Sequence, residues 1–339
     1  MVGYAFVKYN TLPIQYWPSS MKLSPRTISI LKYLFAFCLL WLVLSKVGLD
    51  EIGKHVKEIS FGEGIAALIF ATAAQVSSAM RMRYFFTKAM FTMSAKFAIV
   101  LYYVGAFYNF LLPGGIGGDA YKVMLVRKRM EMSAAQGIRI MVADRASGLC
   151  VIMFTFFLGC YLIGLNNVIP YGSVLLILAT IITPIVYIIA SRKLLKQLPV
   201  DMVGSLSYSV TAQFFWIATL YMLWNSIGHG EHFLEYVTLY CAASIASLIP
   251  LSPGGLGLRE LTYLYGAGLM QTLLARDVNP DVGIAMSLCM FALTFISALP
   301  GLLWLNKVNK ATIEPIKKTH PLSENHYAST ANTSREDWN

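Results

Sequence analysis

Long runs of hydrophobic residues, separated by short polar or charged stretches, dominate this chain. Several runs hold roughly 18 to 25 residues with almost no charge, and a helix needs about 20 residues to cross the hydrocarbon core of a bilayer. The pattern therefore predicts an all-α polytopic membrane protein. The runs lie at about residues 28–47, 62–80, 97–112, 146–165, 171–191, 205–227, 236–249, 257–275 and 281–305.

The positions of Lys and Arg predict which loops face the cytoplasm, because cytoplasmic loops hold an excess of these residues. Basic residues precede the first run, follow the second run at 81–96, and cluster again at 122–139. The segment at 97–121 must then leave and re-enter the same face, as a re-entrant hairpin does. Residues 236–275 lie between stretches poor in Lys and Arg, which predicts a second hairpin entering from outside.

The predicted layout is six full spans plus two re-entrant hairpins, with the N-terminus and the C-terminus in the cytoplasm. Eight spans are the alternative, because the runs at 97–112 and 257–275 are nearly long enough to cross. We expect a cytoplasmic N-terminal segment at 1–27, a transmembrane domain at 28–305 and a polar cytoplasmic tail at 306–339.

Composition supports a membrane location and disfavours other classes of protein. Of the 339 residues, 57% are hydrophobic and 13% are charged, and that charged share is about half of what a soluble domain carries. The net charge of +10 does not indicate a nucleic-acid partner, because the basic residues sit in short loops where orientation in the bilayer explains them. Residues 1–27 lack the pattern of a signal peptide, and Met21 is an alternative start to Met1.

The two predicted hairpins turn on the same short motif. Residues 112–119 read Leu-Pro-Gly-Gly-Ile-Gly-Gly-Asp, and residues 252–260 read Ser-Pro-Gly-Gly-Leu-Gly-Leu-Arg-Glu. Because the hairpins enter from opposite faces, the shared motif suggests an inverted-repeat arrangement, which is common among transporters. Helices broken inside a membrane leave backbone N–H groups and positive dipole ends that attract anions.

The glycine turns and the charged residues near them form the substrate-binding site that we predict. An ionisable residue at membrane depth indicates function, since burying its charge costs about 2.5 to 3.5 kcal/mol. We expect Arg259 and the half-helix ends to hold the phosphate of a lipid headgroup. The predicted residues are Gly114, Gly115, Asp119, Lys122, Asp144, Arg145, Gly254, Gly255, Arg259 and Glu260.

Each charged group also has a purely structural interpretation. The adjacent Arg259–Glu260 charges can neutralise each other, and Asp119 can cap the helix that it begins. Lys122 can extend toward the membrane surface. The Asp144–Arg145 charges either pair across to a hairpin or form a surface ion pair at a helix start.

With the two turns and the Asp144–Arg145 pair in this order, the chain resembles the lysylphosphatidylglycerol synthase transmembrane-region family, also called flippase-like. The resemblance covers about residues 28–305 and implies a membrane domain that moves a lipid, or a lipid-linked sugar or amino acid, between leaflets. In bacterial relatives this domain accompanies an aminoacyl-transferase domain, and in some archaeal relatives a glycosyltransferase. The family often has arginine shortly after the residue matching Asp119, whereas Lys122 here lacks the planar fork of arginine.

The leading hypothesis is a translocator in the bacterial inner membrane that moves a phospholipid or lipid-linked headgroup between leaflets and is not an enzyme. One alternative is an accessory membrane subunit of a separate glycosyltransferase or lipid-modifying synthase. Another is a membrane-embedded transferase in which Asp119 or Glu260 acts as a base. We expect no cofactor and no metal, because the sequence has no phosphate-binding P-loop and no cluster of His and Cys with ligand spacing. The headgroup, the direction of movement and the oligomeric state stay open.

Overall fold

A computed structural model of the protein describes residues 34, 37, 41, 49–111, 117–130, 132–168, 170–195, 202–227, 232–249 and 253–309. The segment at 1–27 with both candidate starts, most of the first predicted run and of the polar tail, and the glycines Gly114 and Gly115 lie outside these ranges. Within the described ranges the regular elements are helices and no strand occurs, which confirms the all-α fold.

The helices follow the predicted hydrophobic runs closely at most of their ends. They are α2 (Leu49–Glu58), α3 (Phe61–Lys88), α4 (Ala95–Leu111), α5 (Gly117–Met130), α6 (Ala134–Leu162), α7 (Gly172–Leu195), α8 (Met202–Ile227), α9 (Phe233–Ala246), α10 (Leu258–Leu274), α11 (Pro280–Ala298) and α12 (Pro300–Asn309). Short 3₁₀ turns lie at Leu165–Asn167 (η1) and Pro253–Gly255 (η2). The last predicted run is divided before Pro300, since proline suits the first turn of a new helix.

The predicted loop at 81–96 is wrong in most of its length. Helix α3 continues to Lys88, so only a short turn separates it from α4. Residues 65–88 contain no Gly, Pro or Asn that would end a helix. Arg81 is consequently helical and buried rather than a loop residue.

Four stretches of the described chain are long and apolar enough to cross a bilayer, namely α3, α6, α7 and Pro280–Trp304. The protein is therefore a polytopic helical membrane protein. Helices α4 and α10 have 17 residues each, and α5 and α9 have 14 each. At 1.5 Å per residue they measure about 26 Å and about 21 Å, which is less than the roughly 30 Å of a hydrocarbon core.

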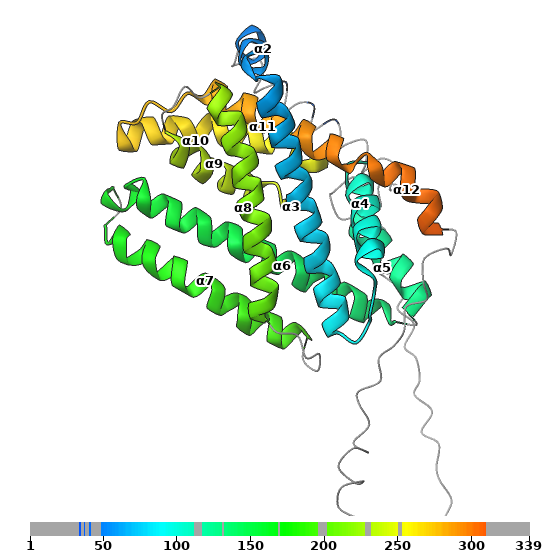
Figure 1. The fold of residues 1–339 in the computed structure, drawn as a ribbon. Coiled ribbons are helices and arrows are strands. Elements are labelled where there is room, and N and C mark those ends of the chain that lie inside the picture. Colours follow the sequence, from blue (N-terminus) through cyan, green and yellow to red (C-terminus); the bar gives the residue numbers. More distant parts are fainter. Residues whose placement is uncertain are drawn as a thin grey trace, which may run out of the picture.

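Helices α3 and α8 pack side by side through the centre of the bundle, and α6 pairs with α7 (Figure 1). Helices α4, α5 and α12 form one edge of the bundle, while α9 packs against α6 and α10. One core of buried side chains forms around α8 to α11 and includes Leu220 and Tyr263. A second core forms around α3 and α6 and includes Phe85 and Ile140. Helix α7 is strongly apolar and has few buried residues, as expected of a membrane helix with one face toward lipid.

Helices α4 and α5 approach each other at two glycines. A Cβ atom added to Gly118 would collide with the backbone carbonyl oxygen of Gly105, and the Gly118 N–H donates to Asn109 Oδ1 at 2.9 Å. Small residues at such a crossing let two membrane helices pack backbone against backbone. The glycines therefore fix how α5, and Asp119 on it, lies against α4.

Gly118→Ala is expected to destabilise the protein by about 1 to 3 kcal/mol, because the added methyl group meets backbone that cannot rotate away. Thermal unfolding in detergent measures this loss. Gly268→Ala in α10 is the matched control, since nothing lies within 4 Å of its Cβ position. The control is expected to leave stability unchanged or raise it by up to about 1 kcal/mol. Equal unfolding temperatures for the two variants contradict the tight crossing.

Candidate functional site

A cavity of about 680 Å³ lies between α4, α5, α6 and the second glycine turn. Phe291 on α11 lies between the end of α4 and the turn η2: its ring contacts that of Phe110 edge-on, with ring centroids 5.4 Å apart. A Cβ at Gly254 would lie 2.8 Å from that same Phe291 ring. Gly254 and Gly255 have φ values of +61° and +78°, which glycine adopts without strain. The second turn thus closes one end of a cavity that the first hairpin helps to build.

Two charged side chains, Asp119 and Arg145, line this cavity. Asp119 lies in the first turn of α5, and Arg145 lies within α6, so two neighbouring helices supply the pair. Arg145 Nε donates to Asp119 Oδ2 at 2.7 Å, and the Arg145 side chain remains 48% exposed. The carboxylate is therefore neutralised while a guanidinium faces the cavity.

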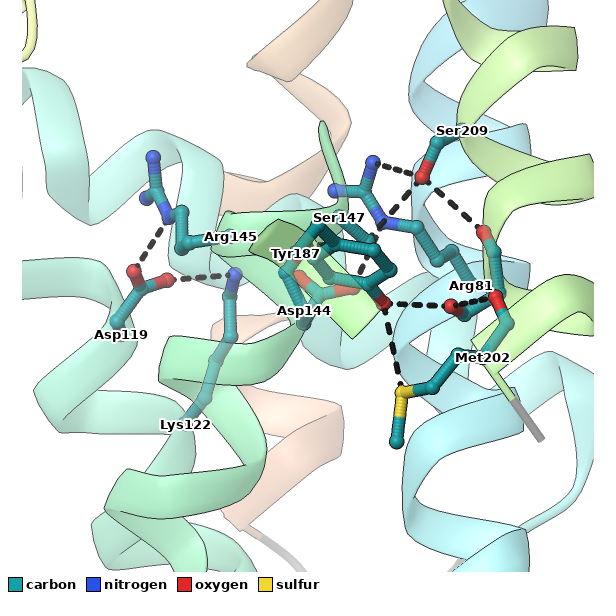
Figure 2. Close-up of polar contacts among 10 residues, drawn as sticks. Arg81, Asp119, Lys122, Asp144, Arg145, Ser147, Tyr187, Met202 and Ser209 are labelled. Carbon is teal, nitrogen blue, oxygen red and sulfur yellow. Dashed lines mark hydrogen bonds and ion pairs between the residues drawn. The ribbon is translucent and has the colours of Figure 1, made fainter. Parts of the chain in front are cut away.

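Lys122 completes this charged group from behind the cavity wall. Its Nζ donates to Asp119 Oδ1 at 3.0 Å, one helical turn along α5, and lies 4.7 Å from the centroid of the Tyr102 ring. The Lys122 side chain is 4% exposed, so the expected extension toward the membrane surface is wrong. Figure 2 shows Lys122 and Arg145 meeting the two oxygens of Asp119 from different sides. Asp119 therefore binds two cations from the first turn of α5.

Asp144 and Arg145 are neighbours in sequence but point to different partners. Asp144 Oδ1 accepts from Arg81 Nε on α3 at 2.8 Å, and both of these side chains are at most 10% exposed. Asp144 and Arg145 lie within α6 rather than at its start, so they do not form a surface ion pair at a helix start. The adjacent residues Asp144 and Arg145 of α6 therefore connect a buried ion pair to the cavity.

The sealed pair extends into a polar network between four helices (Figure 2). Arg81 Nη1 donates to Ser209 Oγ on α8 at 3.2 Å, and that hydroxyl lies 3.2 Å from Ser147 Oγ on α6. Near this network, the hydroxyl of Tyr187 on α7 lies 2.6 Å from Ser205 Oγ on α8. Gly148 gives the guanidinium room, since a Cβ there would lie 2.8 Å from Arg81 Nη1. The contacts of Arg81, Ser209 and Ser147 tie α3, α6 and α8 together beside the cavity, and the Tyr187 contact joins α7 to α8 nearby.

The second hairpin positions its two charges separately. Glu260 is fully buried and accepts from the Gly257 N–H and from Ser287 Oγ, each at 2.7 Å. Within the described residues, no ion pair joins Arg259 to Glu260. The Arg259 stem lies 3.4 Å from the Cβ position of Gly255, and Arg259 Nε is buried without a hydrogen-bond partner. Glu260 therefore closes the start of α10, in the manner of a helix cap.

The structure brings only part of the predicted site together at the cavity. Asp119, Arg145, Gly254 and Gly255 line it. The other described members of the predicted site lie outside its lining and are Lys122, Asp144, Arg259 and Glu260. Gly114 and Gly115 cannot be placed, because they fall outside the described residues.

Sequence reasoning missed three polar residues in or beside the site. Asn109 and Ser247 line the cavity, each shortly before a glycine turn. Their position just before the glycine motifs could have indicated the site, but neither residue is charged, and the prediction selected charged residues and glycines. Arg81 was also missed, because its partner Asp144 lies far away in sequence.

Comparison with known proteins gives a family match over half of the chain. The family model described as the lysylphosphatidylglycerol synthase TM region matches residues 29–198. The matched region includes the first glycine turn, α5 and the Asp144–Arg145 pair, and it ends before the second turn. No curated protein matches this chain.

Proposed function

Because the chain belongs to the lysylphosphatidylglycerol synthase TM region family, we propose that it is a translocator that moves the headgroup of an anionic lipid between leaflets. The observation that carries this proposal is the cavity lined jointly by Arg145, the start of α5 and the second glycine turn. The headgroup enters this cavity, and the acyl chains stay in the bilayer.

The charge of the cavity suits a phosphate. Lys122 and Arg145 contribute two positive charges, and Asp119 contributes one negative charge, which leaves a net charge of +1. The first turn of α5 adds its positive dipole end, since Asp119 and Ala120 from that turn line the cavity. Apolar side chains such as Phe110 and Leu248 make up much of the remaining wall. This mixture supports binding of a headgroup that is charged at one end and joined to hydrocarbon at the other.

The short helices support a re-entrant arrangement. Helices α4 and α5, and likewise α9 and α10, combine a 14-residue and a 17-residue helix on either side of a Pro-Gly-Gly motif. In our proposal these pairs are two hairpins that enter from opposite faces and meet at the cavity, beside six full spans. The basic loops support an orientation in which both termini are cytoplasmic and the domain lies in a bacterial inner membrane. Rocking of the two halves then exposes the cavity to one leaflet at a time.

Filling the cavity tests the proposal without changing a charge. Ala120→Trp is expected to lower headgroup movement at least about tenfold, because the indole occupies space that the headgroup needs. The assay uses purified protein in vesicles with fluorescent phosphatidylglycerol, and added dithionite quenches only the outer leaflet.

Met124→Trp is the matched control, because Met124 lies one turn further along α5, is 59% exposed and does not line the cavity. It is expected to keep the wild-type rate. Wild-type protein that moves lipid no faster than protein-free vesicles contradicts translocation, and binding of a separate synthase then becomes the function to test.

A further inference from the structure

We infer that Asn109 and Ser247 form a hydroxyl-binding subsite in the cavity, so that the protein prefers headgroups that carry hydroxyl groups, such as glycerol or a sugar. The inference rests on the proposed function and adds the class of headgroup that the same cavity takes. Among the described lining residues, Asn109 and Ser247 are the two with uncharged polar side chains. Asn109 lies in the last turn of α4, and Ser247 directly follows α9.

The amide of Asn109 has one atom that is bound and one that is available. The Gly118 N–H donates to Asn109 Oδ1 at 2.9 Å, and only the oxygen of the amide can accept this bond. The bond therefore fixes which way the amide is turned. No acceptor among the described residues binds Asn109 Nδ2, so its N–H groups are available to a molecule in the cavity.

The hydroxyl of Ser247 offers the opposite function. Ser247 Oγ donates to the backbone carbonyl oxygen of Ser244 at 2.7 Å, about one turn earlier along the chain. This bond uses the hydroxyl proton and leaves the lone pairs of Oγ to accept a hydrogen bond. A Cβ atom added to Gly255 would lie 2.5 Å from Ser247 Cβ, so the second glycine turn packs directly against Ser247. That close packing holds Ser247 at the cavity wall.

The two residues lie in adjoining parts of the wall and together present a donor and an acceptor. The end of the chain of contacts from Asn109 is the turn η2, because α4 contacts η2 and η2 packs against Ser247. A hydroxyl group both donates and accepts, so it can bind either residue, and a glycerol or sugar headgroup has enough hydroxyls to bind both. A hydrocarbon group of the same size leaves both polar groups without a partner, which costs free energy in a site shielded from water.

Two lipids of equal charge test this preference. Phosphatidylglycerol and phosphatidylpropanol each carry one negative charge on the phosphate, and only phosphatidylglycerol has hydroxyls on its three-carbon headgroup. In the vesicle assay, wild-type protein is expected to move phosphatidylglycerol at least about tenfold faster, because phosphatidylpropanol loses two hydrogen bonds. Binding is measured separately in detergent, where short-chain phosphatidylglycerol is expected to raise the unfolding temperature more than short-chain phosphatidylpropanol at the same concentration.

Ser247→Ala removes the acceptor and keeps the Cβ atom that packs against Gly255. We expect it to lower the ratio of the phosphatidylglycerol rate to the phosphatidylpropanol rate about threefold. Ser244→Ala is the matched control, because Ser244 lies in α9, its hydroxyl donates to the Tyr240 carbonyl oxygen at 2.8 Å, and it does not line the cavity. The control is expected to keep the wild-type ratio.

Asn109→Leu keeps the approximate shape of the side chain and removes the donor. It is expected to lower the same ratio about threefold, and the double variant with Ser247→Ala is expected to bring the ratio close to one. Loss of the Gly118 bond alone slows both lipids alike and leaves their ratio unchanged. The ratio therefore distinguishes contact with hydroxyls from support of α5. If Asn109→Leu does not fold, Ser247→Ala and its control decide the test.

The outcomes separate this inference from the proposed function. Wild-type protein that moves both lipids equally fast overturns the hydroxyl subsite while translocation stands. Ratios that stay unchanged in Ser247→Ala and in Asn109→Leu overturn the assignment to these two residues. If wild-type protein moves neither lipid, the proposed function fails, and the binding measurement decides the subsite: a larger rise in unfolding temperature with phosphatidylglycerol supports it, and equal or absent rises overturn it.

Discussion

Arg145→Gln is expected to lower the movement of phosphatidylglycerol by roughly 10- to 100-fold while leaving the protein folded. The expected loss corresponds to one charge-assisted hydrogen bond between the guanidinium and the phosphate, which is worth about 1.5 to 3 kcal/mol. Arg145 carries the exposed positive charge of the cavity, with 48% of its side chain accessible. Glutamine keeps a polar side chain of similar reach, so a large effect reports on charge. The initial rate of fluorescent lipid movement in vesicles, together with the detergent elution profile, measures both parts.

Arg139→Gln is the matched control for Arg145→Gln. Arg139 lies on the same helix, is exposed and does not line the cavity. It removes the same charge from α6 and is expected to change the rate less than about twofold, because a charge exposed to water is screened by salt. Equal losses for the two variants would show that general membrane electrostatics, rather than the cavity, governs the rate.

The sequence indicated the helices and the glycine motifs beside the cavity, because both features are local or repeated patterns. Hydrophobic runs are limited by bilayer thickness, so the ends of α8 and α10 could be predicted within a few residues. The motif that ends in Asp119 marked one wall of the cavity, and Gly254 and Gly255 marked another. Neither pattern shows how the helices pack around the cavity, because packing depends on residues far apart in the sequence.

The partners of charged residues were much harder to predict. Adjacent side chains on a helix point about 100° apart, so Asp144 and Arg145 face different neighbours. Which neighbour each one meets depends on the packing of α3 and α5 against α6. The burial of Lys122 could not be predicted for the same reason. Its bond to Asp119 and its contact with Tyr102 depend on how α4 packs against α5.

Two local signals were present in the sequence and were interpreted too narrowly. Glu260 follows Gly257 by three residues, the spacing of a capping interaction at a helix start, and its carboxylate does accept from the Gly257 N–H. Arg81 lies in a stretch without helix-breaking residues, which favours a helix. Only the charge of Arg81 suggested a loop. Buried and exposed arginines differ by their partners, and the partner of Arg81 lies 63 positions away.

Arg81→Met is expected to cause the largest loss of stability, about 3 to 5 kcal/mol, because it leaves the Asp144 carboxylate buried without its cation. Thermal unfolding in detergent measures the loss, and Lys88→Met on the same helix is the exposed control. The double variant Arg81→Met with Asp144→Leu should regain most of the stability, since replacing a whole buried ion pair by apolar side chains is often neutral. The double variant also separates stability from transport. If it folds and still moves lipid, the Arg81–Asp144 pair supports the helices alone; if it folds but moves none, the pair also positions Arg145, its direct neighbour on α6. A single variant as stable as wild type would instead mean that water reaches Asp144.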